Sequence, residues 1–545
     1  MWCKALSTFR KSTQNPLCVQ KRGGDNCFLR SVEHSKIFNE FSQEQKDDFF
    51  SLTDKKVCHH IDSFYYSVSI ENDDTDNECL EMQSLLGQLQ MLKMQKLAHP
   101  EEIVEFCGLE VSPISFSIYQ YHLMLNESFD VFIAENIPND KTPRICVQLR
   151  SRMLFLEGVA ESIEKSYQYV EDLCDYFNLG IFSCSENRID YAYHTNLLQS
   201  SAEYFSTEYL KDHLQSKLRL FHLIGNISDE VEINTFQLGN RKSNNVFLRC
   251  YNKTREVIEK NYKSFFIEAW LENKLISKYD YYCLKKAFEM RSYTTGLLVA
   301  RCEWYLENGN DDTLKAELKD LLVKYYEKND NAPQIEKKIK GILPPVTVIT
   351  NIEFQTKRKF YTSCDSFIEE IDKIVCLHKG KPELYRLSKI LYLRRTFLDY
   401  LTSVTVNFIE DKTVSAKERK MVDWWKRIHS CKILYTDKSP RSLYRDNEKK
   451  SDIAKNKRRL LSAIAKYNVL EKQSLEARTF DEDVRDVLSA LNDNDIHDFN
   501  EKLKDGKLST LRNYQYPSIF ERSSRQLKGI IKEKVKEKEE EENES

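Results

Sequence analysis

The sequence predicts an α+β fold, with a mainly antiparallel sheet, helices on one face of it, and a helical carboxyl-terminal region. Short runs between residues 145 and 306 alternate apolar and polar side chains, as half-exposed strands do. Stretches with helical spacing lie between these runs, so strands and helices are interspersed along the chain. Beyond about residue 365 the spacing is helical almost to the end.

The first part of the sheet surrounds one amphipathic helix. Residues 145–149 alternate like a strand, and Gly158 then precedes a helical stretch that Gly180 is suited to end. Residues 188–194 form a second strand. The apolar stripe of the helix consists of Ile163, Tyr167, Val170, Leu173 and Phe177.

Further elements follow in chain order. Two strands at 236–238 and 246–252 are joined by a polar loop over 239–244 that is rich in Gly and Asn. The remaining predicted elements are a helical stretch at 256–290, a strand at 299–306 and a strand at 346–354.

The chain of 545 residues is too long for one core, so we expect several domains. Residues 1–124 are predicted to be partly irregular with helical segments, including a leucine-rich helix at 84–97 that Ser84 would cap. The α+β domain is predicted to span 125–362. A helical, locally basic region covers 363–530, and 531–545 is a charged tail.

Composition excludes several classes of protein. The net charge of −3 gives no overall attraction to nucleic acid, so any DNA-binding surface must be local. The 15 cysteines include no pair spaced as CxxC, which argues against zinc ribbons and thioredoxin chemistry and fits a reducing cytosol. We found neither a signal peptide nor an apolar segment of about 18 residues, so we expect a cytoplasmic protein with no membrane partner.

Three predicted strands each place polar side chains on one face, because positions two apart in a strand point the same way. If the strands are neighbours, this face collects acids, cations, an imidazole and hydroxyls: Arg188, Asp190 and His194; Arg249, Tyr251 and Lys253; Arg301, Glu303 and Tyr305.

Such a face has a plausible chemistry. Carboxylates bind Mg²⁺ or Mn²⁺, arginine and lysine neutralise phosphate, and a tyrosine hydroxyl attacks phosphorus to form a covalent intermediate. The alternative is an antiparallel sheet with one solvated face, which shows the same alternation without catalysis.

Four stretches resemble motifs of the Rep_trans family, the initiators of rolling-circle replication in plasmids and phages. They are the loop at 239–243, the strand segment Arg-Cys-Tyr-Asn-Lys at 249–253, the run Arg-Ile-Asp-Tyr-Ala at 188–192, and the run Arg-Cys-Glu-Trp-Tyr-Leu at 301–306. Their order and approximate separation along the chain agree with that family. The resemblance implies that 125–362 is a nicking-endonuclease-like catalytic domain. A weaker similarity lies at Trp424 and Trp425.

The resemblance implies roles for individual residues. Tyr251 would be the nucleophile that becomes joined to the 5′ phosphate and frees a 3′ hydroxyl for polymerase. Asp190 and Glu303 would hold Mg²⁺ or Mn²⁺. To these we add Arg249 and Lys253 as phosphate contacts, because they share the strand face of Tyr251.

His194 stands where the family more often has an acid, and it is a further candidate metal ligand. The His-hydrophobic-His pair of the wider nicking superfamily is absent from the sequence. Candidate DNA contacts in the same domain are Arg188, Arg241, Lys242, Ser243 and Arg301.

Residues 412–460 carry 16 lysines and arginines against six acids. This excess could supply phosphate contacts to duplex DNA, with Lys426, Arg427 and Arg441 as candidates. Tryptophans and tyrosines in the same segment could stack on unpaired bases. Equally, they could be the buried face of helices whose lysines are merely solvated.

The expected partners are origin DNA, both duplex and single-stranded, a second copy of the chain in a homodimer, and a host helicase and polymerase. The alternative function is a DNA-binding partition or copy-control protein without catalysis, which would not need Tyr251, Asp190 and Glu303 together. A tyrosine recombinase is disfavoured because no His-x-x-Arg set occurs in the sequence.

Overall fold

A computed structural model of the chain describes residues 37–443 and 459–460, apart from gaps at 51–55, 72–79, 137–142, 200–203, 205, 219–220, 228–230, 262, 328–331, 372–377, 379, 416–417, 434–435 and 438–442. The chain forms two compact units, Met1–Asp446 and Asn447–Ser545. The elements below belong to the first unit. No helix among the described residues is long and apolar enough to span a membrane.

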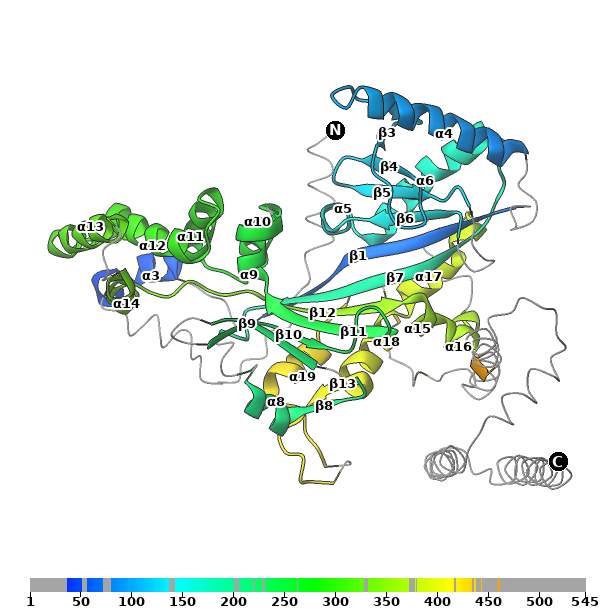
Figure 1. The fold of residues 1–545 in the computed structure, drawn as a ribbon. Coiled ribbons are helices and arrows are strands. Elements are labelled where there is room, and N and C mark those ends of the chain that lie inside the picture. The colour runs from blue at the N-terminus through cyan, green and yellow to red at the C-terminus, as the bar shows by residue number, and fades with distance from the viewer. Residues whose placement is uncertain are drawn as a thin grey trace, which may run out of the picture. The chain divides into compact units, whose positions relative to one another are not determined.

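The first unit is built on an 11-stranded sheet, which confirms the predicted α+β class (Figure 1). Every pair of neighbouring strands is antiparallel. The strands, in their order across the sheet, are β2 (Glu105–Phe106), β3 (Leu109–Ser112), β4 (Tyr121–Leu125), β5 (Phe129–Ile133), β6 (Ile145–Leu149), β1 (Val57–Ile70), β7 (Ile181–Thr195), β12 (Thr350–Lys357), β11 (Val246–Asn252), β10 (Val231–Leu238) and β9 (Phe221–Ile227).

The central strands come from distant parts of the sequence. β7 pairs with β1 on one side and with β12 on the other, and β12 also pairs with β11. The strands predicted at 145–149, 188–194, 236–238 and 246–252 are all present. The strand predicted at 346–354 begins later, at Thr350.

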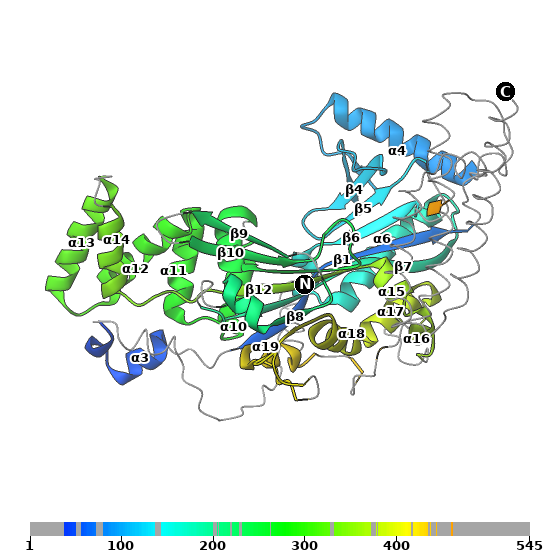
Figure 2. The ribbon, with the colours of Figure 1, turned by 60° about the horizontal axis from the view of Figure 1, so that its bottom comes forward.

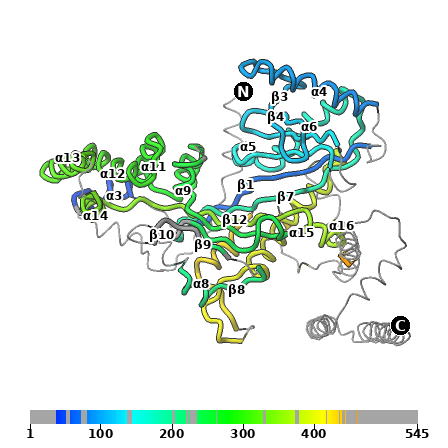
Figure 3. Tube along the Cα trace, viewed as in Figure 1, coloured from blue at the N-terminus to red at the C-terminus, as the bar shows by residue number. Residues whose placement is uncertain are grey.

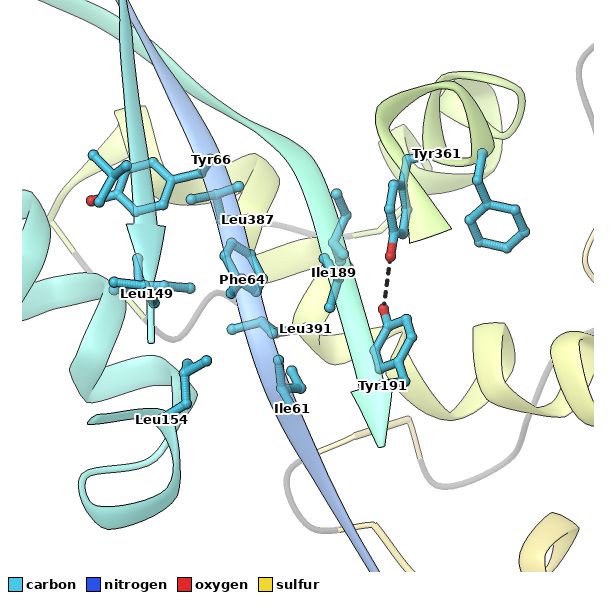
Figure 4. Close-up of a cluster of buried hydrophobic side chains, with 14 of the residues drawn as sticks. Ile61, Phe64, Tyr66, Leu149, Leu154, Ile189, Tyr191, Tyr361, Leu387 and Leu391 are labelled. Carbon is cyan, nitrogen blue, oxygen red and sulfur yellow. Dashed lines mark hydrogen bonds between the residues drawn. The ribbon is translucent and has the colours of Figure 1, made fainter. Parts of the chain in front are cut away.

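The apolar side chains of the central strands share one face and form the main core. Phe64 of β1 is the register partner of both Leu149 and Ile189, and all three are buried. Figure 4 shows these side chains beside Tyr191, whose hydroxyl lies 3.0 Å from that of Tyr361. The helices that contribute to this core include α6 (Val159–Tyr176), α15 (Arg358–Thr362), α17 (Tyr385–Tyr392), α18 (Arg394–Tyr400) and α19 (Asp423–His429).

Helix α6 matches its prediction closely at the start and less closely at the end. Gly158 is the N-cap and adopts a φ of 88°, which favours glycine. The helix ends at Tyr176, and the residue with left-handed backbone is Asn178, not the expected Gly180. Asn tolerates this conformation because its short polar side chain can bond locally, so it can replace a terminal glycine.

A helical insertion of residues 253–349 separates β11 from β12. Figure 3 traces the chain leaving β11 and returning to β12 after this insertion. Its elements are α9 (Lys253–Glu256), the π-helical turn η2 (Val257–Asn261), α10 (Phe265–Glu272), α11 (Lys278–Glu289), α12 (Thr294–Asn308), α13 (Asp312–Tyr326) and α14 (Ala332–Ile342).

The strand predicted at 299–306 is wrong, because these residues lie in the helix α12. The apparent alternation arises from a helix that is buried on most sides. Arg301, Cys302, Trp304 and Tyr305 are all buried, and Glu303 is the polar residue between them that faces outward. Because most of this helix surface is buried, its sequence of polar and apolar residues resembled the two-residue period of a strand.

The amino-terminal part of the described chain belongs to the same unit as the α+β domain. The sequence had predicted a domain boundary between residues 124 and 125. That boundary falls within β4, before its last residue, and β4 is paired with β5. β1 lies near the middle of the same sheet. Helix α4 (Leu80–Ala98) starts four residues before the expected cap Ser84. Helix α3 (Gln43–Phe49) is followed by Phe50, which packs against Trp304 of the insertion.

The helical prediction for 363–530 holds for the part that the structure describes. Besides α17 to α19 it contains α16 (Asp365–Glu369), η4 (Pro382–Leu384) and η5 (Leu401–Thr405). The short strand β13 (Val406–Phe408) pairs with β8 (Leu214–Ser216), which follows α8 (Thr207–His213). Figure 2 shows β8 beside α18 and α19. The tail at 531–545 lies outside the described residues.

The close packing of α11 on α12 leaves no room for a side chain at position 296, which is glycine. A Cβ at this position would lie 2.9 Å from the Cα of Ala287, which is backbone and cannot move aside cheaply. Gly296→Ala should therefore lower the free energy of unfolding by about 1–3 kcal/mol. Gly341→Ala is the matched control, since a Cβ there meets nothing within 4 Å. It should be neutral or stabilising by up to about 1 kcal/mol. Urea unfolding of both variants decides, and equal stabilities would contradict the helix packing.

Candidate functional site

Tyr251, the expected nucleophile, lies at the centre of a polar cluster on the sheet face opposite the main core. Its side chain is 6% exposed. Its hydroxyl donates to Glu353 Oε2 at 3.3 Å and accepts from Asn351 Nδ2 at 2.8 Å and Lys253 Nζ at 3.3 Å. Burial raises the pKa of Tyr251 well above its usual value, although Lys253 opposes the shift. The hydroxyl is therefore neutral at physiological pH and needs a base to become a nucleophile.

Glu353 supplies a carboxylate beside this hydroxyl, and the sequence prediction missed it. It lies on β12 opposite Arg249 of β11, and it is 3% exposed. Arg249 NH2 donates to both of its carboxylate oxygens, at 3.0 and 3.1 Å. The same guanidinium lies 4.4 Å from the centre of the Tyr251 ring. Arg249 thus holds the carboxylate of Glu353 in place within reach of the tyrosine proton.

Lys253, the second expected cation, is buried immediately beyond the end of β11. Its Nζ forms an ion pair of 2.7 Å with Glu256 in addition to its contact with Tyr251. Burial lowers the pKa of Lys253, but the nearby Asp62, Tyr251 and Glu256 outweigh this and hold it well above its usual value. The ammonium is therefore charged, and its position beside the hydroxyl favours a tyrosinate over a neutral tyrosine.

Asp190 shares the polar face but has a different partner. It lies on β7 opposite Gln355 of β12, and Arg188 Nε donates to it at 2.8 Å. Burial raises the pKa of Asp190 to about 7, reinforced by Glu353 and Asp62 and opposed by Arg188. A buried carboxyl that titrates near neutrality is typical of functional sites.

His194 lies on the same face of β7, on the other side of β12 from Tyr251. Trp270 of α10 donates its indole N–H to His194 Nδ1 at 3.1 Å, which leaves the ring proton on Nε2 in the neutral imidazole. His60 of β1 packs edge-on against it, with ring centres 4.3 Å apart. Because Nδ1 accepts and Nε2 carries the proton, neither nitrogen has a lone pair free for a metal.

The expected metal ligands are not brought together. Glu303 lies on α12, where it is 41% exposed and paired with Lys286 at 3.7 Å. Its neighbour Arg301 is buried and donates to backbone oxygens of the insertion, including Leu343 O, so it is not placed to contact DNA. In the part of the chain that the structure describes, no group of three His, Cys, Asp or Glu side chains is placed to hold a metal ion. The set Asp190, Glu303 and His194 therefore does not fit Mg²⁺ or Mn²⁺.

The remaining candidate DNA contacts divide into three groups. Arg241, Lys242 and Ser243 are exposed on the loop before β11, and Arg188 is partly exposed on the polar face. Lys426 and Arg427 are exposed on α19, where Arg427 pairs with Asp423 at 3.0 Å. Arg441 lies outside the described residues.

Trp424 and Trp425 are not available for stacking on bases. Both are buried, and their indole nitrogens donate to Tyr209 OH at 2.9 Å and to Thr402 O at 2.8 Å. For these two tryptophans, the structure shows the second of the two explanations that the sequence left open, a buried aromatic face of a helix.

Comparisons with known proteins add little to this geometry. No family model and no curated protein sequence matches the chain. Among solved structures, it is similar to the rolling circle replication initiator protein from Geobacillus stearothermophilus, with 10% sequence identity and a TM-score of 0.31 over 69% of this chain and 96% of that one. A likeness at this score carries no argument by itself, so any function must be argued from the side chains described above.

The raised pKa of Asp190 has a measurable consequence for stability. A carboxyl with a folded-state pKa near 7 and an unfolded value near 3.8 destabilises the fold as pH rises between these values. Asp190→Asn cannot ionise, so its stability relative to the original protein should improve from pH 5 to pH 8. The relative change should exceed about 1.4 kcal/mol, the equivalent of one pKa unit. Urea unfolding at both pH values measures it, and a difference that is independent of pH would contradict the assignment.

Proposed function

We propose that this chain is an initiator of rolling-circle replication that nicks one DNA strand through a covalent bond to Tyr251. The observation that carries the proposal is the environment of the Tyr251 hydroxyl. One buried carboxylate accepts from it, one buried ammonium contacts it, and a guanidinium lies over its ring. These are a base, a charge that stabilises tyrosinate, and a cation for the phosphate. The resemblance to the Rep_trans motifs at 239–253 and 188–192 supports the same assignment.

In the proposed step, the oxygen of Tyr251 attacks a backbone phosphorus while its proton passes to Glu353. The new bond joins Tyr251 to the 5′ phosphate, and the bond from phosphorus to the 3′ oxygen breaks. The 3′ oxygen takes up a proton from water and becomes the hydroxyl that primes synthesis. Arg249 and Lys253 neutralise the charge that develops on the phosphate oxygens. The phosphotyrosine retains the energy of the broken bond for later rejoining.

Access to the hydroxyl requires movement of the helical insertion. Tyr251 is 6% exposed, whereas the side chain of Arg249 on the same face is 29% exposed. Lys253 lies 4.9 Å from the ring centre of Phe266 on α10, so this helix packs directly on the site. The intervening π-helical turn η2 is a type of irregularity found frequently at functional sites. We propose that a DNA strand enters beside Arg249 as α9 and α10 shift.

A DNA-binding protein without catalysis remains the second candidate. Its supporting observation is that every buried charge around Tyr251 already has an opposite charge beside it, as in a purely structural network. The two functions differ in whether a covalent DNA adduct forms.

Tyr251→Phe should abolish both nicking and the adduct, because phenylalanine keeps the packing but has no oxygen to attack phosphorus. The measurement uses a labelled single-stranded origin oligonucleotide and supercoiled plasmid, with Mg²⁺, with Mn²⁺ and with a chelator. Tyr282→Phe is the matched control, because its hydroxyl donates to Glu307 at 2.8 Å on the insertion, away from the site. An adduct of normal yield in Tyr251→Phe would refute the proposal.

Glu353→Gln should slow nicking by at least about 100-fold, since an amide cannot accept the tyrosine proton. Glu303→Gln should nick at the original rate, because Glu303 is on the surface of α12. Rates are normalised to the folded fraction from thermal melting, since Glu353→Gln leaves Arg249 without its anion. Loss of activity in Glu303→Gln with normal activity in Glu353→Gln would contradict the role given to Glu353. It would support Glu303, the acid that the sequence indicated.

A further inference from the structure

Three cations converge on the polar face of the sheet, away from Tyr251. Arg188 of β7 and Lys357 of β12 are register partners, and Arg241 lies in the loop that Lys357 contacts. We call Arg188, Lys357 and Arg241 the cationic corner. Lys357 is six residues along β12 from Asn351, the register partner of Tyr251. At about 3.3 Å per residue, the corner is roughly 20 Å from the proposed nucleophile.

The side chains of the cationic corner are held in place by contacts with the surrounding strands and loop. Lys357 Nζ donates to the backbone oxygens of Arg241 and Lys242, at 2.5 and 2.8 Å, which fixes the loop against β12. Arg241 Nε donates to Gln355 Oε1 at 3.2 Å. The guanidinium of Arg188 lies 5.1 Å from the ring centre of Tyr65, its register partner on β1. Four strand or loop segments thus fix three positive charges side by side.

The charge of the cationic corner is incompletely neutralised. Arg188 has a partner in Asp190, but within the described chain neither Lys357 nor Arg241 has an ion pair with a carboxylate. Burial lowers the pKa of Lys357, and the positive charges of Arg188 and Arg241 lower it further. Arg241 is also exposed, so an anion can reach the corner from solvent.

From this arrangement we infer that the cationic corner binds a backbone phosphate of the single DNA strand, several nucleotides away from the phosphate at Tyr251. The identity of the anion rests on the proposed function. Two phosphate contacts on one sheet face would fix the direction and register of the strand before cleavage. The strand would then cross β12 and β11 along the polar face, between the corner and Arg249.

The test uses the full chain carrying Tyr251→Phe, so that binding is measured without cleavage. A fluorescent single-stranded DNA that spans both positions is titrated at several salt concentrations. Arg241→Gln should weaken binding roughly tenfold. The slope of log affinity against log salt should fall by about 0.7, the value for one phosphate contact on a single strand. This substitution leaves the contacts of Lys357 to the loop backbone in place. Lys357→Gln should act in the same direction, with an amide still able to donate to the loop.

Lys324→Gln is the charge-matched control, because Lys324 is exposed on α13 of the insertion and pairs with Asp320. It should leave affinity and slope unchanged. Unchanged affinity and slope in both Arg241→Gln and Lys357→Gln would overturn the inference, as would an effect on duplex DNA alone. The two proposals fail separately. If the Tyr251 adduct forms but the corner variants bind normally, only the inference falls. If the corner variants bind weakly and the original protein forms no adduct, only the nicking function falls.

Discussion

The arrangement of the polar face depends on matching each buried carboxylate with a cation. Glu353 is 3% exposed and pairs with Arg249, and Asp190 is 2% exposed and pairs with Arg188. A carboxylate buried at that depth without a partner would be costly. Removing one partner of such a pair costs about 3–5 kcal/mol, because the other charge is left buried and alone. The pairs therefore constrain which residues can face each other across β7, β12 and β11. Tyr251 lies among these ion pairs, and its hydroxyl is within hydrogen-bonding distance of the Glu353 carboxylate and the Lys253 ammonium.

The place of the helical insertion explains why the site is covered. The insertion begins two residues after Tyr251, and its last residue, Ile349, lies two residues before Asn351 and four before Glu353. Both strands that carry the site are thus tethered to the same group of helices. Trp270 and Phe266 of α10 then pack against His194. A shift of the insertion would move the ends of both strands at once. In the proposed function, entry of the DNA strand would therefore be linked to the positions of the groups around the Tyr251 hydroxyl.

The sequence predicted most of the sheet, because half-buried strands such as 188–194 and 246–252 keep a clear period of two. It also brought Tyr251, Arg249 and Lys253 together correctly. It failed at Glu303, where a helix buried on most sides has side chains whose polarity alternates by coincidence. Glu353 had a usable signal, since Asn351 and Glu353 alternate with Ile352 and Phe354, but the strand was interpreted only for its apolar residues. The positions of Asp62 and His60 near the site could not be predicted, because nothing local showed that β1 would pair with β7 across more than a hundred residues.

The separation of β11 from β12 by residues 253–349 also governs when the site can exist during synthesis. A ribosome adding about 5–20 residues per second takes roughly 5–20 s to pass from one strand to the other. Throughout that interval the emerging chain carries Tyr251, Arg249 and Lys253 but neither Asn351 nor Glu353, so β11 lacks the neighbour that neutralises its guanidinium. Two hydrophobic clusters consist mainly of residues of the insertion, and the residues from outside it, such as Phe41 and Phe50, are synthesised earlier. A half-made chain therefore holds Tyr251 without Glu353, so the proposed nicking activity would require that translation has passed β12.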